Sequence, residues 1–194
     1  MKKVSRDHLM LRKVKQLKNG GLFLEYRLKG AAGGDQYISD ITLKDPREPH
    51  PDLTCLIDKL DTLLAKSVGF GDILTVKEGV DIQMTKAQNL VIDRVFAHLL
   101  SLIEVTGIAI SGDEGKQGAV ITGTMLCKNG GVVALNSPHI KTALDKFGFE
   151  EELQEIIDDL HREVYLFLYE HKAAQLDLFN EAAEADKIKE LAAV

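Results

Sequence analysis

The glycine loop at residues 111–117 is the first segment whose residue types suggest chemistry. A phosphate-binding loop, in which glycine amides and a lysine hold phosphate oxygens, ends in a glycine–lysine pair such as Gly115 and Lys116. Ile110, however, stands at the place of the first glycine, and Gln117 at the place of the magnesium-binding hydroxyl. Because both defining positions fail, a plain connection between two strands is the better interpretation.

The histidines and carboxylates show no catalytic or metal-binding spacing. No histidine has a second histidine or a cysteine three or four residues away, as two ligands on one helix face require. We expect His161 and His171 at the surface of a helix, and Asp58 and Asp61 as solvated charges on another. The sequence also lacks a nucleophile elbow and a dinucleotide fingerprint. We therefore predict no catalytic residues, no metal, no cofactor, and a protein that binds instead of catalysing.

Residues 175–179 read Gln-Leu-Asp-Leu-Phe. This pentapeptide resembles the segment by which bacterial replicative polymerases, clamp loaders, mismatch-repair proteins and some phage proteins bind the DNA sliding clamp. The resemblance covers five of the 194 residues. It implies one role for each residue: a hydrogen bond at the pocket rim for Gln175, support of the approach for Leu176, a tolerated polar spacer at Asp177, and filling of the hydrophobic pocket by Leu178 and Phe179. Two adjacent apolar side chains on a short peptide suit such a cleft, since little else must be ordered.

A second interpretation of the same segment stays open. Residues 173–194 contain strong helix formers throughout. An apolar stripe on such a helix could pack on the body of the protein or on another subunit, and it would consist of Leu176, Phe179, Ala183, Ile188 and Leu191. If Phe179 is buried in this way, the docking hypothesis loses most of its support.

The N-terminal end is basic although the formal net charge of the chain is −6. Residues 1–30 hold nine lysines and arginines against two acidic residues. A positive hairpin with aromatic side chains can follow a phosphate backbone and stack a base, so we predict contacts to DNA from Arg12, Lys13, Lys15, Lys18 and Arg27, with Phe23 and Tyr26 as the aromatics. The alternative is that the lysines only protect a sheet edge from pairing with another chain.

Length and composition predict a soluble protein that folds without cross-links. With 194 residues and 45% apolar content, the chain can bury a core. Cys55 and Cys127 lie in separate apolar stretches, so we expect reduced core residues and no disulfide. The first residues lack the apolar run of a signal peptide, and no window has the roughly 18 apolar residues of a membrane span. We expect a cytoplasmic protein without membrane contact.

Turn residues and apolar spacing predict the elements. Two Asn-Gly pairs, at 19–20 and 129–130, predict hairpins with primed turns. The expected strands cover residues 11–17, 22–28, 36–43, about 73–76, 103–111, 119–127 and 132–136, and Pro138 is expected to end the sheet region. Apolar residues at three- and four-residue spacing predict helices over 53–68, from a capping box at 85–88 to Leu100, and from Phe149 onward.

We therefore predict an α+β fold in which antiparallel hairpins pack against two or three amphipathic helices. Residues 1–172 form one domain with a long C-terminal helix, and 173–194 form a tail. Lys-Asn-Gly-Gly occurs at both Lys18 and Lys128, so the chain either duplicates a βββα unit or uses a common hairpin turn twice. Residues 164–169 are apolar on all sides, which suggests a homo-oligomer.

Two functions follow from these features. In the first, the protein is an accessory of DNA replication, recombination or repair, of cellular or phage origin, that binds the sliding clamp through residues 175–179 and DNA through the basic hairpin. In the second, it is a self-assembling structural or regulatory protein that binds neither.

Overall fold

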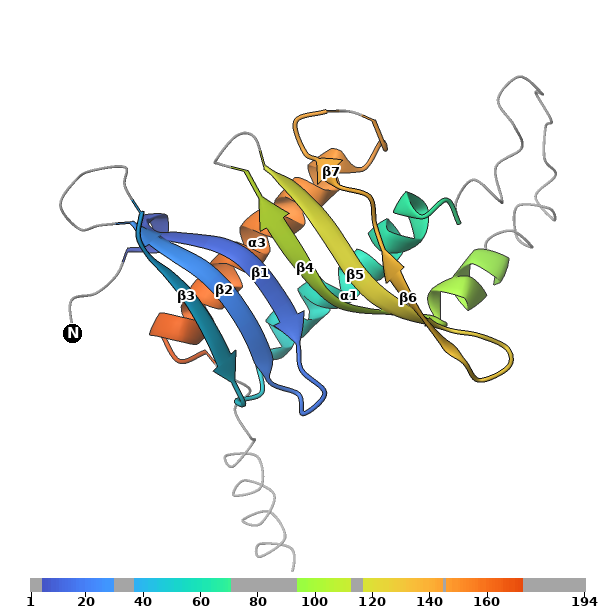
Figure 1. Ribbon diagram of the computed structural model, residues 1–194, viewed down its shortest axis with the longest axis horizontal. Helices are drawn as coiled ribbons and strands as arrows, with labels where there is room; N and C mark the ends of the chain where they lie inside the picture. The colour runs from blue at the N-terminus through green and yellow to red at the C-terminus, as the bar shows by residue number, and fades with distance from the viewer. Residues whose placement is uncertain (1–4, 30–36, 71–93, 113–116, 145, 173–194) are drawn as a thin grey trace, which may run out of the picture.

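A computed structural model describes residues 5–29, 37–70, 94–112, 117–144 and 146–172 of the chain. The strands form one antiparallel sheet in the order β3-β2-β1-β4-β5-β6, and β7 also pairs with β5. The long helices α1 and α3 both lie behind this sheet in Figure 1. The predicted α+β fold is confirmed, with hairpins on one side and amphipathic helices on the other.

The strands and helices that were predicted within the described residues occur in the predicted order. The elements are η1 (Arg6–His8), β1 (Leu9–Gln16), β2 (Leu22–Lys29), β3 (Tyr37–Asp45), α1 (Pro51–Ser67), β4 (Ile103–Ser111), β5 (Gly118–Leu126), β6 (Val132–Asn136), β7 (Ile140–Lys141) and α3 (Glu150–Tyr169). Residues 94–100 are also helical, in agreement with the end of the second predicted helix. The strand predicted near 73–76 and the capping box at 85–88 lie outside the described residues.

The sheet is built from two βββα units that meet at β1 and β4. Val14 lies opposite Ile108, and the flanking pairs are Lys13 with Ala109 and Lys15 with Gly107. Val14 and Ile108, the central pair, are 94 residues apart in the sequence, and the two flanking pairs lie symmetrically about it. Both strands also have a bulge at the same place, after Leu11 and after Val105. The arrangement therefore supports a duplicated βββα unit related by an approximate two-fold axis.

The repeated Lys-Asn-Gly-Gly does not occupy equivalent positions in the two βββα units. One copy joins β1 to β2 and the other joins β5 to β6, so the two turns are not equivalent in the duplicated unit. In each, the glycine after asparagine has a left-handed φ, 83° at Gly20 and 78° at Gly130, whereas neither asparagine has a positive φ. The predicted primed turns are wrong: a tight turn closed by the Gly20 N–H and Leu17 carbonyl is followed by a glycine bulge.

The core lies between the sheet and the two helices. The apolar stripes predicted for α1 and α3 are buried, and they consist of Leu53, Leu56, Ile57, Leu60, Leu63 and Leu64 in α1 and of Leu153, Ile156, Ile157, Leu160 and Val164 in α3. Each such side chain contributes roughly 1.5–3 kcal/mol when it leaves water. These two stripes hold the sheet on one face only.

Three local expectations need correction. The sheet does not end at Pro138, because β7 follows it and pairs with β5. Cys55 is exposed on α1, and Cys127 is half-buried, so neither thiol is a core residue. Residues 164–169 are covered by the chain's own side chains: Phe167 is 1% exposed and lies beneath Arg47. Their apolar character therefore gives no argument for a second subunit.

Helix α3 begins in an unusual way. The buried carboxylate of Glu150 accepts hydrogen bonds from the backbone N–H groups of Lys146, Phe147 and Phe149. Burial acts to raise the pKa of Glu150, but these backbone donors outweigh it and lower the pKa. This first residue of α3 thus fixes the preceding loop. None of the described helices has the length and apolarity needed to cross a membrane.

Candidate nucleic-acid interface

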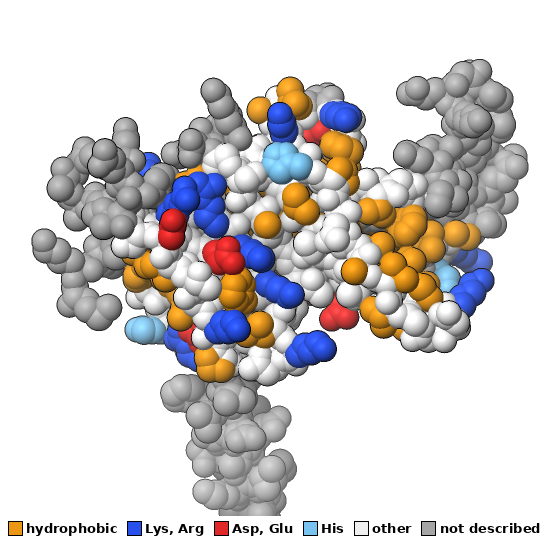
Figure 2. All heavy atoms as spheres, viewed as in Figure 1, with side chains coloured by type: hydrophobic (Ala, Val, Ile, Leu, Met, Phe, Trp, Pro, Cys, Tyr) orange, Lys and Arg blue, Asp and Glu red, His pale blue; other side chains and the backbone are white. Residues whose placement is uncertain are grey.

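The face of β1–β3 turned away from the helices is basic. Side chains alternate along β2, so Leu22, Leu24 and Tyr26 are buried while Phe23 and Arg27 point outward. Cross-strand pairing places the neighbours on the same face, and the outward charged residues are Lys13, Lys15, Arg27, Lys29 and Lys44 against Glu25 and Asp40. Figure 2 shows these cations gathered over β1–β3. We call this surface the basic face.

Phe23 lies on the middle strand of the basic face, near the β1–β2 turn. Lys15 of β1 and Lys44 of β3 pair directly with it on either side. The ammonium group of Lys13 lies 5.5 Å from the centre of its ring. An aromatic ring surrounded by three lysines combines a surface on which a base can stack with charges that bind the flanking phosphates.

The five predicted DNA contacts divide into two groups. Lys13 and Lys15 lie on the basic face, and Lys18 is exposed on the adjoining β1–β2 turn. Arg27 lies there as well, and two of these cations are paired with carboxylates on the same face, Lys13 with Glu25 at 3.7 Å and Arg27 with Asp40. Arg12 differs, since it occupies the bulge of β1, donates to the Gly112 carbonyl at 3.4 Å and has a buried Nε without a hydrogen-bond partner among the described residues. Arg12 therefore joins β1 to the end of β4.

Tyr26 was expected to stack on a base, and this is wrong. Its ring is 8% exposed and faces the helices. Burial, together with the neighbouring Tyr169, raises the pKa of Tyr26 to about 12. The alternation of β2 contained this information, because Tyr26 shares its face with Leu22 and Leu24. The same alternation would have added Lys29 to the predicted contacts, whereas Lys44 required the pairing of β2 with β3.

Two polar helix residues expected in solvent face the sheet. The carboxylate of Asp61 in α1 accepts a hydrogen bond of 2.9 Å from the Val105 N–H at the start of β4. Burial raises the pKa of Asp61. His161 of α3 bonds through Nε2 to the Leu9 carbonyl at the start of β1. Both residues are half-buried, so the surface expectation is corrected.

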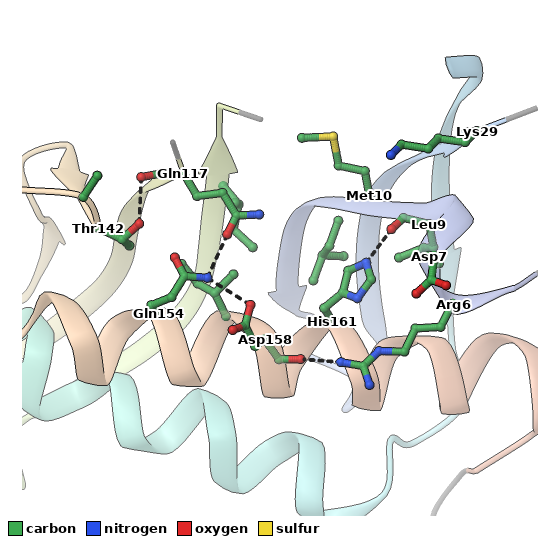
Figure 3. Close-up of a pocket in the computed structure, with 14 residues that line it drawn as sticks. Arg6, Asp7, Leu9, Met10, Lys29, Gln117, Thr142, Gln154, Asp158 and His161 are labelled. Atoms are coloured by element: carbon green, nitrogen blue, oxygen red, sulfur yellow. Dashed lines mark hydrogen bonds between the residues drawn. The ribbon is translucent and has the colours of Figure 1, made fainter. Parts of the chain in front are cut away.

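A cavity of about 620 Å³ lies where β1 and β4 separate. The two strands pair only from Lys13 to Lys15, and beyond that they diverge over α3. Figure 3 shows the two walls, with Leu9 and Met10 of β1 on one side and Gln117, which directly precedes β5, on the other. The α3 residues at its floor are Gln154, Ile157, Asp158 and His161.

One contact joins a hydroxyl to an imidazole, as in a nucleophile–base pair. The hydroxyl of Ser111 lies 2.7 Å from Nε2 of His139. Among the described residues, no carboxylate lies within hydrogen-bond distance of His139 to orient it as a general base. No group of three metal-binding side chains occurs in the same described part of the chain. The contact is a hydrogen bond between an exposed strand end and a loop.

The pentapeptide at 175–179 lies outside the described residues, as do Gly115 and Lys116. The last described residue is Lys172, whose ammonium group lies 2.6 Å from both Asp52 of α1 and Glu163 of α3. These two bonds raise the pKa of Lys172, with Asp52 the larger cause. Lys172 is therefore held between the start of α1 and the last part of α3.

Comparisons with known proteins do not assign the chain. No family model matches it, and neither a curated protein nor a solved structure shows significant similarity. The basic face and the pentapeptide are therefore the two features that indicate a function.

Proposed function

We propose that the protein is a non-catalytic accessory of DNA replication, recombination or repair that binds single-stranded DNA on its basic face and docks on a bacterial sliding clamp through residues 175–179. The observation that carries the proposal is the lysine-surrounded Phe23 on a sheet face that no described helix covers. A strand on this face would place one base on the ring and its phosphates beside Lys15 and Lys44.

The local charge supports DNA binding although the whole chain is acidic. Five cations and two carboxylates on the basic face leave a net charge of +3, while the chain as a whole carries −6. Phosphates within about 10 Å respond mainly to the nearest charges, because salt screens the more distant ones. Stacking of one base on an aromatic ring adds about 1–3 kcal/mol. The face is therefore suited to a single strand whose bases are accessible.

Docking on the clamp would compensate for the small size of this surface. The pentapeptide begins three residues after Lys172, which is bound to α1 and α3. A body linked to the clamp by so short a segment stays at a high local concentration near primer-template DNA. Weak binding by a few lysines is then sufficient for function.

The DNA-binding part is tested by charge reversal. Lys15→Glu with Lys44→Glu changes the basic face, while Lys59→Glu with Lys128→Glu makes the same charge change at exposed positions on α1 and in the β5–β6 turn. Fluorescence anisotropy with labelled oligothymidylate should show about a tenfold or larger loss of affinity for the first pair only. Equal losses for both pairs, or no binding by the wild type, would reject the basic face.

The clamp-binding part is tested by titrating a purified bacterial sliding clamp. The double variant Leu178→Ala, Phe179→Ala should lose binding because it removes the two side chains that fill the pocket. The matched control is Ile188→Ala, Leu191→Ala, which shortens two apolar side chains elsewhere in the tail. If both double variants bind as the wild type does, or if the wild type does not bind, the docking hypothesis is wrong.

One observation favours the second candidate, self-assembly. Strand β6 is an edge of the sheet and contains no charged residue. Val132 and Val133 are 66% and 47% exposed, and Leu126 beside them is 49% exposed. Unprotected apolar edges are able to pair with another chain. Light scattering should show loss of oligomers in Val132→Lys, Val133→Lys but not in Ser39→Lys, Thr42→Lys on the opposite edge, and a monomeric wild type would exclude this candidate.

A further inference from the structure

The cavity between β1 and β4 passes from α3 through the sheet to the basic face. Successive residues of a strand point to opposite faces, and the lining contains Leu9 and Leu11 from one face of β1 and Met10 from the other. The floor contains Ile157 of α3, and Lys29 lines the opposite end. Met10 also pairs with Arg27 of the basic face. A molecule bound on that face therefore has access to the cavity.

The lining suits an uncharged molecule with both apolar and polar groups. Its charged residues are Arg6 and Lys29 against Asp7 and Asp158, so the formal charges cancel when His161 is neutral. A phosphate would gain little in such a site, whereas the same cavity offers apolar contact from the leucines and isoleucines and from the polarizable thioether of Met10, which packs well on aromatic rings.

One hydrogen-bond donor is directed into this space. The side-chain oxygen of Gln117 accepts from Nε2 of Gln154 at 3.0 Å, which fixes the orientation of the Gln117 amide. Its nitrogen then points between the two walls, as Figure 3 shows, and has no partner among the described residues. Gln154 is itself held by Asp158 at 2.9 Å. An amide donor fixed in this way would bind a carbonyl or ring nitrogen of a base.

We propose that the cavity takes up one unstacked base of the DNA strand that lies on the basic face. This inference depends on the proposed function. The phosphates stay with the lysines of the basic face, and the base enters beside Met10 and accepts a hydrogen bond from Gln117. The strand would then be held at two points, by stacking on Phe23 and by insertion of a second base, as proteins that recognise single strands commonly do.

The test uses oligonucleotides that contain 2-aminopurine, a fluorescent base whose emission changes when it leaves the stack. Ala143→Trp fills the cavity from an exposed position on its rim, and Ala97→Trp is the matched control on the helix at 94–100. Gln117→Ala removes the donor without adding bulk. We expect the wild type and Ala97→Trp to change the emission, and Ala143→Trp to abolish this change and to lower affinity about tenfold.

The outcomes separate the two proposals. If the wild type binds the oligonucleotide with a salt-dependent affinity but Ala143→Trp and Gln117→Ala give the same emission change and affinity as the wild type, the base-binding cavity is rejected and the basic face stands. If the wild type binds no oligonucleotide under any salt condition, the proposed function is rejected, and the inference with it. A weaker emission change in Gln117→Ala, with circular dichroism unchanged, supports the donor role of Gln117.

Discussion

The two ends of the joint between β1 and β4 differ although the βββα units that form it are equivalent. At the α1 end, Asp61 binds the Val105 N–H, and Leu64 of α1 packs against Gly123. At the α3 end, His161 binds the Leu9 carbonyl, but a cavity of about 620 Å³ remains. One copy of the unit thus closes the joint, and the other leaves it open.

A single position explains much of this difference. Gly123 pairs with Val105 in the second unit, and the equivalent pair in the first unit is Tyr26 with Leu11. A Cβ atom at Gly123 would lie 2.7 Å from both Cδ2 of Leu64 and the Glu104 carbonyl oxygen, so only glycine lets α1 approach this closely. The Tyr26 ring instead occupies the space between its strand and Tyr169 of α3. The two βββα units therefore meet in one stabilising joint and one recess.

The largest expected effect comes from replacing Gly123, where the missing side chain allows α1 to pack closely on the sheet. Gly123→Ala places a methyl group against backbone that cannot move freely, and we expect a loss of about 3 kcal/mol in the free energy of unfolding. Urea denaturation measures this. The control is Gly131→Ala, where the new methyl group meets only the Asn129 side chain. Similar losses in both variants would show that close packing at Gly123 is not what holds α1 to the sheet.

A smaller effect should distinguish Asp61 from His161. Asp61→Ala leaves the Val105 N–H without an acceptor under a packed helix, so we expect a loss of about 2 kcal/mol. His161→Ala leaves the Leu9 carbonyl beside a cavity that water can enter, so the expected loss is below about 1 kcal/mol. Urea denaturation of both variants, with Asp58→Ala as an exposed reference, checks the order. The reverse order would contradict the distinction between a closed and an open end.

The free energy of unfolding should also depend on pH in acid, through a carboxylate at the end of β3. The Arg47 side chain, which donates to both oxygens of Asp45, lowers the pKa of that carboxyl below its ordinary 3.8. The unfolded chain therefore binds the proton more readily, so this contribution is complete above pH 3.8 and is lost as the pH falls further. Asp45→Asn should flatten the decline in stability below that pH, whereas Asp40→Asn, at an exposed ion pair, should change it little.

The smallest effect is expected where α3 ends. His171 has a left-handed φ of 57°, and the next N–H, that of Lys172, bonds back to the Leu166 carbonyl. Glycine adopts this conformation without the steric cost of a Cβ atom, so His171→Gly should stabilise the fold by about 1 kcal/mol. Thermal denaturation measures the gain. Glu170→Gly, at a position with negative φ, should give no gain.

The sequence was sufficient for the longer strands and helices because each has a local signal, whereas the short elements η1 and β7 were not predicted. Alternation in β2, β-branched residues in β4 and the apolar stripes of α1 and α3 predicted those elements closely. The same alternation already excluded Tyr26 as a stacking residue, because it places Tyr26 on the same strand face as the buried leucines of β2. Lys13 and Lys15 were predicted as DNA contacts from their charge alone.

The remaining features depend on contacts between distant residues. The role of Lys44 requires the pairing of β3 with β2, and those of Asp61 and His161 require the helices to be placed on the sheet. The cavity results from the divergence of β1 and β4, which are separated by the whole first unit in the sequence. No local pattern records such a divergence, because it is a property of how two complete units meet.

The most direct test of the account is to map where a DNA strand contacts the protein. Photo-crosslinking of an oligonucleotide that carries 5-iodouracil, followed by mass spectrometry of the peptides, would locate the contact residue by residue. We predict crosslinks to Phe23 and to the peptides of β1 and β2 that carry Lys13, Lys15 and Lys29. Crosslinks confined to the outer surfaces of α1 and α3, or none at saturating protein, would contradict the claim that the basic face of β1–β3 binds DNA.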